Sequence, residues 1–268
     1  MEDGFSLSQG PSVVVVLQAC FSFCLVASAV YIFNDLLDKE QDARHPQKRH
    51  RPIPSGMVSE RLAFWLGTLL LTTGLSIAGL AASWPVLLLE AAYWGLNIVY
   101  SFYLKRLAIL DVLSVAAGFV MRVLAGAFAL SVEPSHWLLL CTFLLALFLA
   151  LGKRGMEPAA SDGRPSDQSP APALYPGDLV KQMSLVVCAA TIVSYAIYTV
   201  APDTVANLGA DRLVYSVAFV IYGLFRYLVL LQRQETGGCP TDLLLHDRPL
   251  LGCLMLWLLY CVYVVYSI

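Results

Sequence analysis

The amino-acid sequence predicts an all-α, polytopic transmembrane helical bundle, and three observations support this prediction. Apolar residues make up 58% of the 268 residues and charged residues only 13%, whereas soluble domains are roughly half apolar and a quarter charged. The mean hydropathy is +0.70. The apolar residues also form continuous runs of about 20 residues, the length that a helix needs to cross a bilayer. Lipid is therefore the expected solvent for most of the chain.

Eight such apolar runs follow one another along the chain. They fall at about 13–33, 62–82, 84–103, 109–130, 135–152, 179–200, 212–232 and 249–268. These runs are too continuously apolar for the alternating strands of a barrel, and in lipid a single segment satisfies its backbone hydrogen bonds only as a helix. We therefore expect one transmembrane domain over residues 1–268. Within it, residues 158–176, rich in Pro, Ala, Ser and Asp, are expected to form a flexible cytoplasmic loop or lid.

Basic residues indicate how the bundle is oriented. Most of the 17 Lys and Arg residues lie in the loops after the first, third, fifth and seventh runs or at the adjoining helix ends. Because positively charged loops stay on the cytoplasmic side, we expect an integral protein of the inner, cytoplasmic membrane whose site faces the cytoplasm. A net charge of −2 provides no general attraction to nucleic acid, so no such partner is expected. A homo-oligomer is compatible with the sequence.

An acidic motif at the cytoplasmic end of the first run gives the strongest functional signal. Asn34, Asp38 and Asp42 recur every four residues, so on a helix they share one face. Three hard oxygen ligands suit Mg²⁺, which takes a few carboxylates together with phosphate oxygens and water. We predict that these three residues hold Mg²⁺ against a diphosphate and that, with Asp35, they are catalytic. The alternative is a helix end that is acidic only because it is solvated.

A basic segment follows the acidic motif directly. Its candidate phosphate-binding residues are Arg44, His45, Lys48, Arg49 and Arg51. Acids that hold a cation, next to bases that hold anions, are typical of a polyphosphate site. The prolines of this segment favour a shaped loop over a continuing helix. The alternative for any single base is that it only anchors the loop on the cytoplasmic side.

Charged and polar residues inside the third and fourth runs mark further candidates, because ionisable side chains in lipid are costly. Asp111 and Arg122 lie three helical turns apart and share a face with Gly118. Arg122 has two interpretations: it binds a substrate phosphate, or it pairs with an internal acid such as Glu90.

A similar polar stripe runs along the third run and ends at the basic residues that follow it. Its members are Glu90, Tyr93, Asn97 and Tyr100, followed by Lys105. We predict that Tyr100, Lys105, Asp111 and Arg122 bind substrate. Further candidates for substrate binding lie near the cytoplasmic ends of the fifth and seventh runs. They are Lys153, Arg154, Glu157 and Arg226.

The acidic motif, NDxxDxxxD at the end of a membrane helix, resembles the first aspartate-rich motif of the UbiA superfamily of intramembrane prenyltransferases. Other segments are similar to the decaprenyl-phosphate phosphoribosyltransferase branch of that superfamily. These segments are 45–53, 100–105, 111–122, 152–157, 222–227 and 247–249. Together they cover nearly the whole chain from about residue 21.

The resemblance implies a Mg²⁺-dependent pentosyltransferase. It implies that the donor is phosphoribosyl pyrophosphate, that the acceptor is a polyprenyl phosphate such as decaprenyl phosphate, and that pyrophosphate is released. The extra bases fit this donor, which carries a 5-phosphate besides its diphosphate. Lys153, Arg154 and Glu157 stand where the superfamily usually has a second pair of aspartates. The resemblance also implies a further N-terminal helix before the motif helix, which would make nine spans where this sequence shows eight.

Two alternatives remain open at this point. The first is a prenyltransferase of the same superfamily, which would move a prenyl group from a prenyl diphosphate to an aromatic or lipid acceptor. The second is a membrane transporter or channel. A transporter predicts ion-path residues near the middle of the bilayer and internal repeats, whereas the polar residues of this chain gather at one surface.

Overall fold

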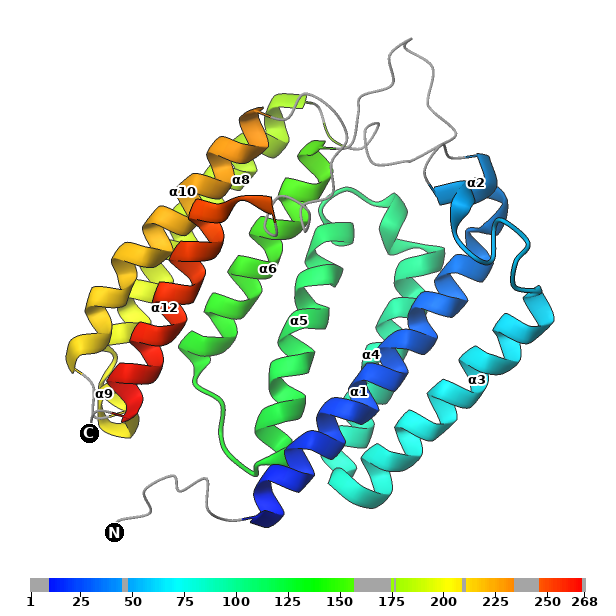
Figure 1. Ribbon diagram of the computed structural model, residues 1–268, viewed down its shortest axis with the longest axis horizontal. Helices are drawn as coiled ribbons and strands as arrows, with labels where there is room; N and C mark the ends of the chain where they lie inside the picture. The colour runs from blue at the N-terminus through cyan, green and yellow to red at the C-terminus, as the bar shows by residue number, and fades with distance from the viewer. Residues whose placement is uncertain are drawn as a thin grey trace. The chain divides into compact units, whose positions relative to one another are not determined.

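The computed structural model describes residues 10–44, 48–156, 175, 177–208, 211–233 and 246–266. In this part of the chain the regular secondary structure is helical, without a strand, so the predicted all-α fold class is confirmed. The chain divides into two compact units (Figure 1). Unit 1 holds residues 1–134 with 166–169, and unit 2 holds the remainder. That residues 1–268 act as one domain stays a prediction.

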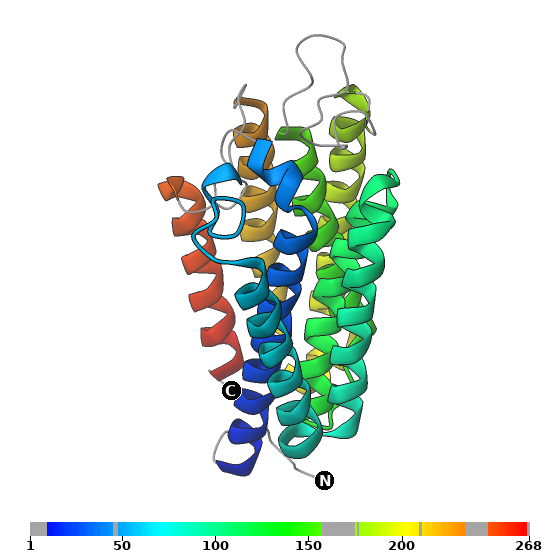
Figure 2. The same cartoon turned by 90° about the vertical axis from the view of Figure 1, so that its right-hand side faces the viewer.

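The described residues of unit 1 form four long helices that pack side by side, with short elements at both ends (Figure 2). The long helices are α1 (Gly10–Leu37), α3 (Glu60–Ile77), α4 (Trp84–Phe102) and α5 (Leu110–Ala129). Helix α2 (Lys39–Arg44) and the 3₁₀ turns η1 (Lys48–His50) and η3 (Leu104–Arg106) lie at one end, which we call the motif end. The π-helical turn η2 (Ala78–Ala82) continues α3 at the opposite end.

The described residues of unit 2 form four long helices and two short ones. They are α6 (His136–Met156), α8 (Gly177–Val200), α9 (Pro202–Leu208), η4 (Asp211–Ser216), α10 (Val217–Arg233) and α12 (Arg248–Tyr266). Its apolar core is formed by Phe148, Cys188, Leu224, Tyr227 and Leu250. These core residues come from α6, α8, α10 and α12, so every long helix of the unit contributes to one core.

Among the described residues, seven helical segments are long and apolar enough to cross a membrane. They are Val13–Leu37, Glu60–Leu80, Leu110–Ala129, His136–Gly155, Leu179–Val200, Arg212–Gln232 and Arg248–Tyr266. The remaining run expected from the sequence is helix α4, which has 19 residues and carries Glu90 and Asn97, whose polar side chains reduce its hydropathy. The seven segments support an integral membrane protein.

Helices α1 and α3 approach each other closely at Gly74. A Cβ atom on this residue would lie 2.8 Å from Cγ2 of Val26 and 2.9 Å from the carbonyl oxygen of Ser22. The second contact is to backbone, which cannot move aside as a flexible side chain can. Only glycine therefore fits at this point of the helix pair, and the close contact fixes α1 against α3 below the acidic motif.

We expect Gly74→Ala to destabilise the protein, because the added methyl group overpacks the contact between α1 and α3; overpacking costs roughly 1–3 kcal/mol. Thermal unfolding in detergent measures the effect as a lower Tm. Gly126→Ala in helix α5 is the matched control, since a Cβ there meets no atom within 4 Å. Equal Tm values for the two variants would contradict the close approach.

Candidate functional site

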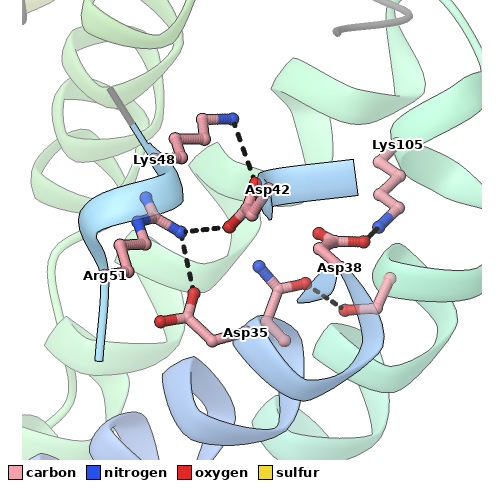
Figure 3. Close-up of polar contacts among 8 residues, drawn as sticks. Asp35, Asp38, Asp42, Lys48, Arg51 and Lys105 are labelled. Atoms are coloured by element: carbon pink, nitrogen blue, oxygen red, sulfur yellow. Dashed lines mark hydrogen bonds and ion pairs between the residues drawn. The ribbon is translucent and has the colours of Figure 1, made fainter. Parts of the chain in front are cut away.

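The acidic motif begins on helix α1 and continues into α2. The backbone amide of Asp38 donates to the carbonyl of Asn34 at 2.9 Å, and that of Asp42 donates to the carbonyl of Asp38 at 2.8 Å. The i to i−4 pattern of hydrogen bonds thus passes through the junction between the two helices. Asn34, Asp38 and Asp42 consequently follow one another at the four-residue spacing of a helical face, and Figure 3 shows Asp38 and Asp42 near each other.

The basic loop after α2 turns back onto this acidic face. Nη1 of Arg51 lies 2.8 Å from Oδ1 of Asp35 and 3.0 Å from Oδ2 of Asp42, and Nζ of Lys48 lies 3.9 Å from Oδ1 of Asp42. Asp42 is only 4% exposed. A carboxylate buried to this degree requires charged or hydrogen-bonding partners, and Arg51 and Lys48 supply them.

The end of helix α4 contributes the opposite wall of the site. Nζ of Lys105, on the turn η3, lies 2.5 Å from Oδ1 of Asp38. Oγ of Ser101 donates to Oδ1 of Asn34 at 3.0 Å. In Figure 3, Lys105 and Asp38 lie on one side of the cluster, and Arg51 and Asp35 lie on the other. The acidic motif is therefore held between two groups of residues from separate parts of the sequence.

The start of helix α5 lies next to the turn that carries Lys105. Ile109, which precedes the helix, has a φ of 70°, a left-handed conformation that is strained for a β-branched residue. Asp111 lies in the first helical turn and is fully buried. An acid at this place interacts favourably with the positive end of the helix dipole. Asp111 thus stabilises the start of α5, and its contact with substrate stays a prediction.

The chemistry of the acidic motif fits a hard divalent cation. Within the described ranges, no three His, Cys, Asp or Glu side chains are grouped so that they could hold a metal ion. The predicted ligand set contains only two acids, Asp38 and Asp42, together with the amide oxygen of Asn34. Each of the two carboxylates has a basic partner. Because all the donors are oxygen atoms, Mg²⁺ is the ion that suits them, with phosphate oxygens and water completing its shell.

Arg122 lies deeper in unit 1, and it does not pair with Glu90. Its Nη2 donates to the hydroxyl of Tyr93 at 2.8 Å and its Nη1 donates to the carbonyl of Gly118 at 3.1 Å. Glu90 is fully buried and accepts a hydrogen bond from Oγ of Ser22 at 2.5 Å. The interpretation of Arg122 as the ion-pair partner of Glu90 is therefore wrong, because a serine from α1 is closer.

The other predicted residues of unit 1 lie at the motif end. Arg44 ends α2 and Arg49 lies on η1, and both are exposed. Nε of Arg49 donates to Nε2 of His50 at 3.2 Å. Tyr100 lies in the last turns of α4 and is half-buried. His45 lies outside the described residues.

Three of the predicted site residues, Lys153, Arg154 and Arg226, lie in the described part of unit 2. Lys153 and Arg154 lie in the last turn of α6. Arg226 instead forms a bidentate ion pair with Asp247, at 2.7 Å and 3.2 Å. Asp247 also accepts a hydrogen bond from the amide of Leu250 at 2.9 Å, which caps the start of α12. Glu157 and, apart from Tyr175, residues 158–176 lie outside the described residues, so the lid stays a prediction.

Sequence reasoning missed Ser101, which contacts the acidic motif. The signal was present, because Ser101 follows Asn97 by four residues and so extends the polar stripe of α4. A lone serine near a helix end gives little indication of its partner. Only the packing of α4 against α1 brings it to Asn34.

Comparison with known protein families shows where this chain belongs. The model of the UbiA prenyltransferase family matches residues 4–246. The chain belongs to the UbiA prenyltransferase family. The superfamily predicted from the NDxxDxxxD motif is therefore confirmed, and the acidic residues of this UbiA chain lie within the matched part.

Several curated relatives of this UbiA chain are named decaprenyl-phosphate phosphoribosyltransferase. The protein from Mycolicibacterium smegmatis is 30% identical over 246 residues, which cover 88% of this chain and 76% of the relative. The protein from Corynebacterium glutamicum is 28% identical over 257 residues, which cover 95% of this chain and 77% of the relative. The predicted resemblance to this pentosyltransferase branch is thereby confirmed.

Solved structures share the fold of this UbiA chain. A UbiA homolog from Archaeoglobus fulgidus, bound to DMAPP and Mg²⁺, aligns with a TM-score of 0.70 and 17% identity, covering 96% of this chain and 89% of that protein. The same homolog bound to GPP and Mg²⁺ aligns with a TM-score of 0.69. At this identity the likeness establishes the fold alone. The family and the named transferases among its relatives favour an enzyme over the transporter alternative.

Proposed function

We propose that this chain transfers a phosphoribosyl group from phosphoribosyl pyrophosphate to a polyprenyl phosphate, such as decaprenyl phosphate, and releases pyrophosphate. The reaction would take place at the inner leaflet of the cytoplasmic membrane, on the cytoplasmic face. The observation that carries the proposal is the set of bases around the acidic motif. Its relatives named decaprenyl-phosphate phosphoribosyltransferase support the same transferred group and acceptor.

The charges of the motif end explain why a metal ion is needed. Three acids, Asp35, Asp38 and Asp42, are paired with three bases, Lys48, Arg51 and Lys105. This cluster is balanced, so it has little attraction for a polyanionic donor. A divalent cation on the acids would release the bases to bind phosphate oxygens. The balanced cluster thus favours a donor that arrives together with Mg²⁺.

The reaction requires a phosphate oxygen of the acceptor to attack C1 of the ribose. The C1–O bond to pyrophosphate then breaks, and its electron pair leaves with the pyrophosphate. Bound Mg²⁺ supplies stabilisation of the negative charge on that leaving group. Asn34, Asp38 and Asp42 would hold the ion, while Arg51 and Lys105 would bind phosphate oxygens. The acceptor phosphate is already an anion, so no general base is required.

A prenyl diphosphate donor is the alternative, since an acidic motif that holds Mg²⁺ suits either diphosphate. It is the donor class bound in the Archaeoglobus fulgidus homolog. Thermal unfolding in detergent with Mg²⁺ distinguishes the two. We expect phosphoribosyl pyrophosphate to raise the Tm more than geranyl diphosphate at the same concentration. The reverse order would favour the prenyl donor and contradict our proposal.

Arg49 tests whether a second anion is bound beside the diphosphate. It is exposed, and in the described part of the chain its contact is with the neighbouring His50. We expect Arg49→Ala to weaken binding of phosphoribosyl pyrophosphate roughly tenfold, the equivalent of about 1.4 kcal/mol, and to affect pyrophosphate less, because Arg49 would contact the 5-phosphate. Calorimetric titration of both ligands measures this difference.

The control for this variant is Arg61→Ala, which removes an exposed arginine from the first turn of α3. The control should leave both affinities unchanged. Equal weakening of pyrophosphate binding and of phosphoribosyl pyrophosphate binding by Arg49→Ala would show that Arg49 contacts the diphosphate. The case for a second anion pocket would then be lost.

A further inference from the structure

Arg122 is a charged residue in the interior of a membrane helix. It lies eleven residues after Asp111 on α5, which is about 16 Å along the helix axis at 1.5 Å per residue. Its side chain turns back towards the motif end, because Nη1 bonds the carbonyl of Gly118, four residues nearer to that end. A charge at this depth is costly, and such residues mark ligand or substrate paths.

Among the described residues, the groups that contact the guanidinium of Arg122 are neutral. The guanidinium carbon lies 5.4 Å from the ring centre of Phe23, 4.9 Å from that of Tyr93 and 5.0 Å from that of Phe119. Its hydrogen-bond acceptors are a hydroxyl and a backbone carbonyl. These contacts orient the cation, but each of them is with a neutral group. The positive charge itself is therefore left for a ligand to neutralise.

The arrangement around Arg122 is built before any ligand arrives. Gly118 makes room for the Tyr93 ring, since a Cβ at Gly118 would lie 3.3 Å from Cε2 of that ring. Tyr93 is only 4% exposed, whereas Arg122 is half-buried. Arginine has five N–H donors in a fixed fork. A fork held in place by a buried ring, yet partly accessible, suits an anion with several oxygen atoms.

We propose that Arg122, positioned by Tyr93, binds the phosphate of the lipid acceptor, a phosphomonoester carried on an isoprenoid chain. The inference rests on the proposed function and names the residue that recognises the acceptor. An anion that reaches this depth must bring its own apolar chain, and the exposed ring of Phe119 offers that chain an aromatic surface. The water-soluble donor, in contrast, has its bases at the motif end.

Binding of farnesyl phosphate to the full-length protein in detergent tests the inference. We expect Arg122→Met to weaken the binding of farnesyl phosphate at least tenfold and to leave the binding of phosphoribosyl pyrophosphate unchanged. Arg122→Lys keeps the charge but loses the fork, so a smaller weakening is expected. Tyr93→Phe keeps the ring and removes the hydroxyl, so it should weaken the binding of farnesyl phosphate severalfold. Farnesol, which lacks the phosphate, should bind all variants equally.

Glu90→Gln is the matched control, because it changes another buried ionisable residue of unit 1 that contacts Ser22 and not Arg122. It should leave farnesyl phosphate binding unchanged. If Arg122→Met does not fold, Arg122→Lys and Tyr93→Phe decide, and wild-type affinity in both overturns the inference. Weakened donor binding with unchanged farnesyl phosphate binding also overturns it.

This experiment separates the inference from the proposed function. A loss of farnesyl phosphate affinity in Arg122→Met supports the lipid phosphate site even if the protein transfers no phosphoribosyl group. A protein that transfers phosphoribosyl groups with an unchanged Michaelis constant for the acceptor in Arg122→Met supports the function and overturns the inference.

Discussion

Asp38→Asn and Asp42→Asn are each expected to reduce turnover by about a hundredfold or more, which corresponds to about 3 kcal/mol of transition-state stabilisation. Both residues lie on the face that would hold Mg²⁺, and each change removes the negative charge of a ligand. The loss should therefore appear mainly in kcat, because the metal ion stabilises charge that develops on pyrophosphate as the C1–O bond breaks. Initial rates at saturating Mg²⁺ measure it.

Glu40→Gln is the matched control for these variants. Glu40 lies on α2 between the two aspartates and is exposed, so the variant loses the same charge without losing a predicted ligand. It should retain nearly wild-type turnover. Tm values must also be compared, because Asp42 is buried against Arg51. Near-normal rates in either aspartate variant would contradict the metal assignment.

Lys105→Met is expected to affect metal and donor in opposite directions. Lys105 contacts the carboxylate of Asp38 at 2.5 Å, so it competes with a divalent cation for that oxygen. Without this lysine, Mg²⁺ alone should bind more tightly, since Asp38 keeps its charge and loses its partner. The donor should bind at least roughly tenfold more weakly, about 1.4 kcal/mol, because a phosphate contact is lost. Calorimetric titrations of Mg²⁺ and of the donor with Mg²⁺ measure both.

Arg106→Met provides the control for this second prediction. It removes the neighbouring base of the same turn, η3, and in the part of the chain that the structure describes the base that pairs with Asp38 is Lys105, not Arg106. Both affinities should stay close to those of the wild type. If Lys105→Met weakened the binding of Mg²⁺ and of the donor alike, Lys105 would only hold the site together. It would not move from the carboxylate of Asp38 to a phosphate oxygen when the donor binds.

The fold was largely predictable because lipid imposes a simple rule on each segment by itself. A continuous apolar run must be a helix, and this rule needs no knowledge of partners. Helix α4 shows where the rule weakens, since the polar side chains of Glu90 and Asn97 reduce the hydropathy of a helix that is nevertheless formed. The bounds of helices were less predictable, as α1 continues beyond residue 33 to Leu37.

The site was predictable where it depends on local spacing. The four-residue interval of Asn34, Asp38 and Asp42 fixes their shared face, because the helical repeat alone determines it. The bases of residues 44–51 could also be predicted to lie near the acids, because they follow them directly in the sequence. In the structure, Arg51 contacts Asp35 and Asp42.

Contacts between distant segments were not predictable from spacing. Arg122 was expected to have either a phosphate or Glu90 as its partner, yet three aromatic rings surround it, and the hydroxyl of one of them, Tyr93, accepts its hydrogen bond. The choice of Ser22 as the partner of Glu90 depends on how closely α1 packs in unit 1, which glycines such as Gly74 control. Such packing depends on the whole helix surface and not on any single interval in the sequence.

The transfer reaction itself tests the central claim most directly. Purified protein is incubated with Mg²⁺, decaprenyl phosphate and phosphoribosyl pyrophosphate labelled in the ribose, and the lipid is then extracted. Our account predicts that label enters the lipid fraction, that chelation of Mg²⁺ stops this, and that Asp38→Asn nearly abolishes it. Absence of label in the lipid, with folded protein that instead transfers a prenyl group from geranyl diphosphate, would contradict it.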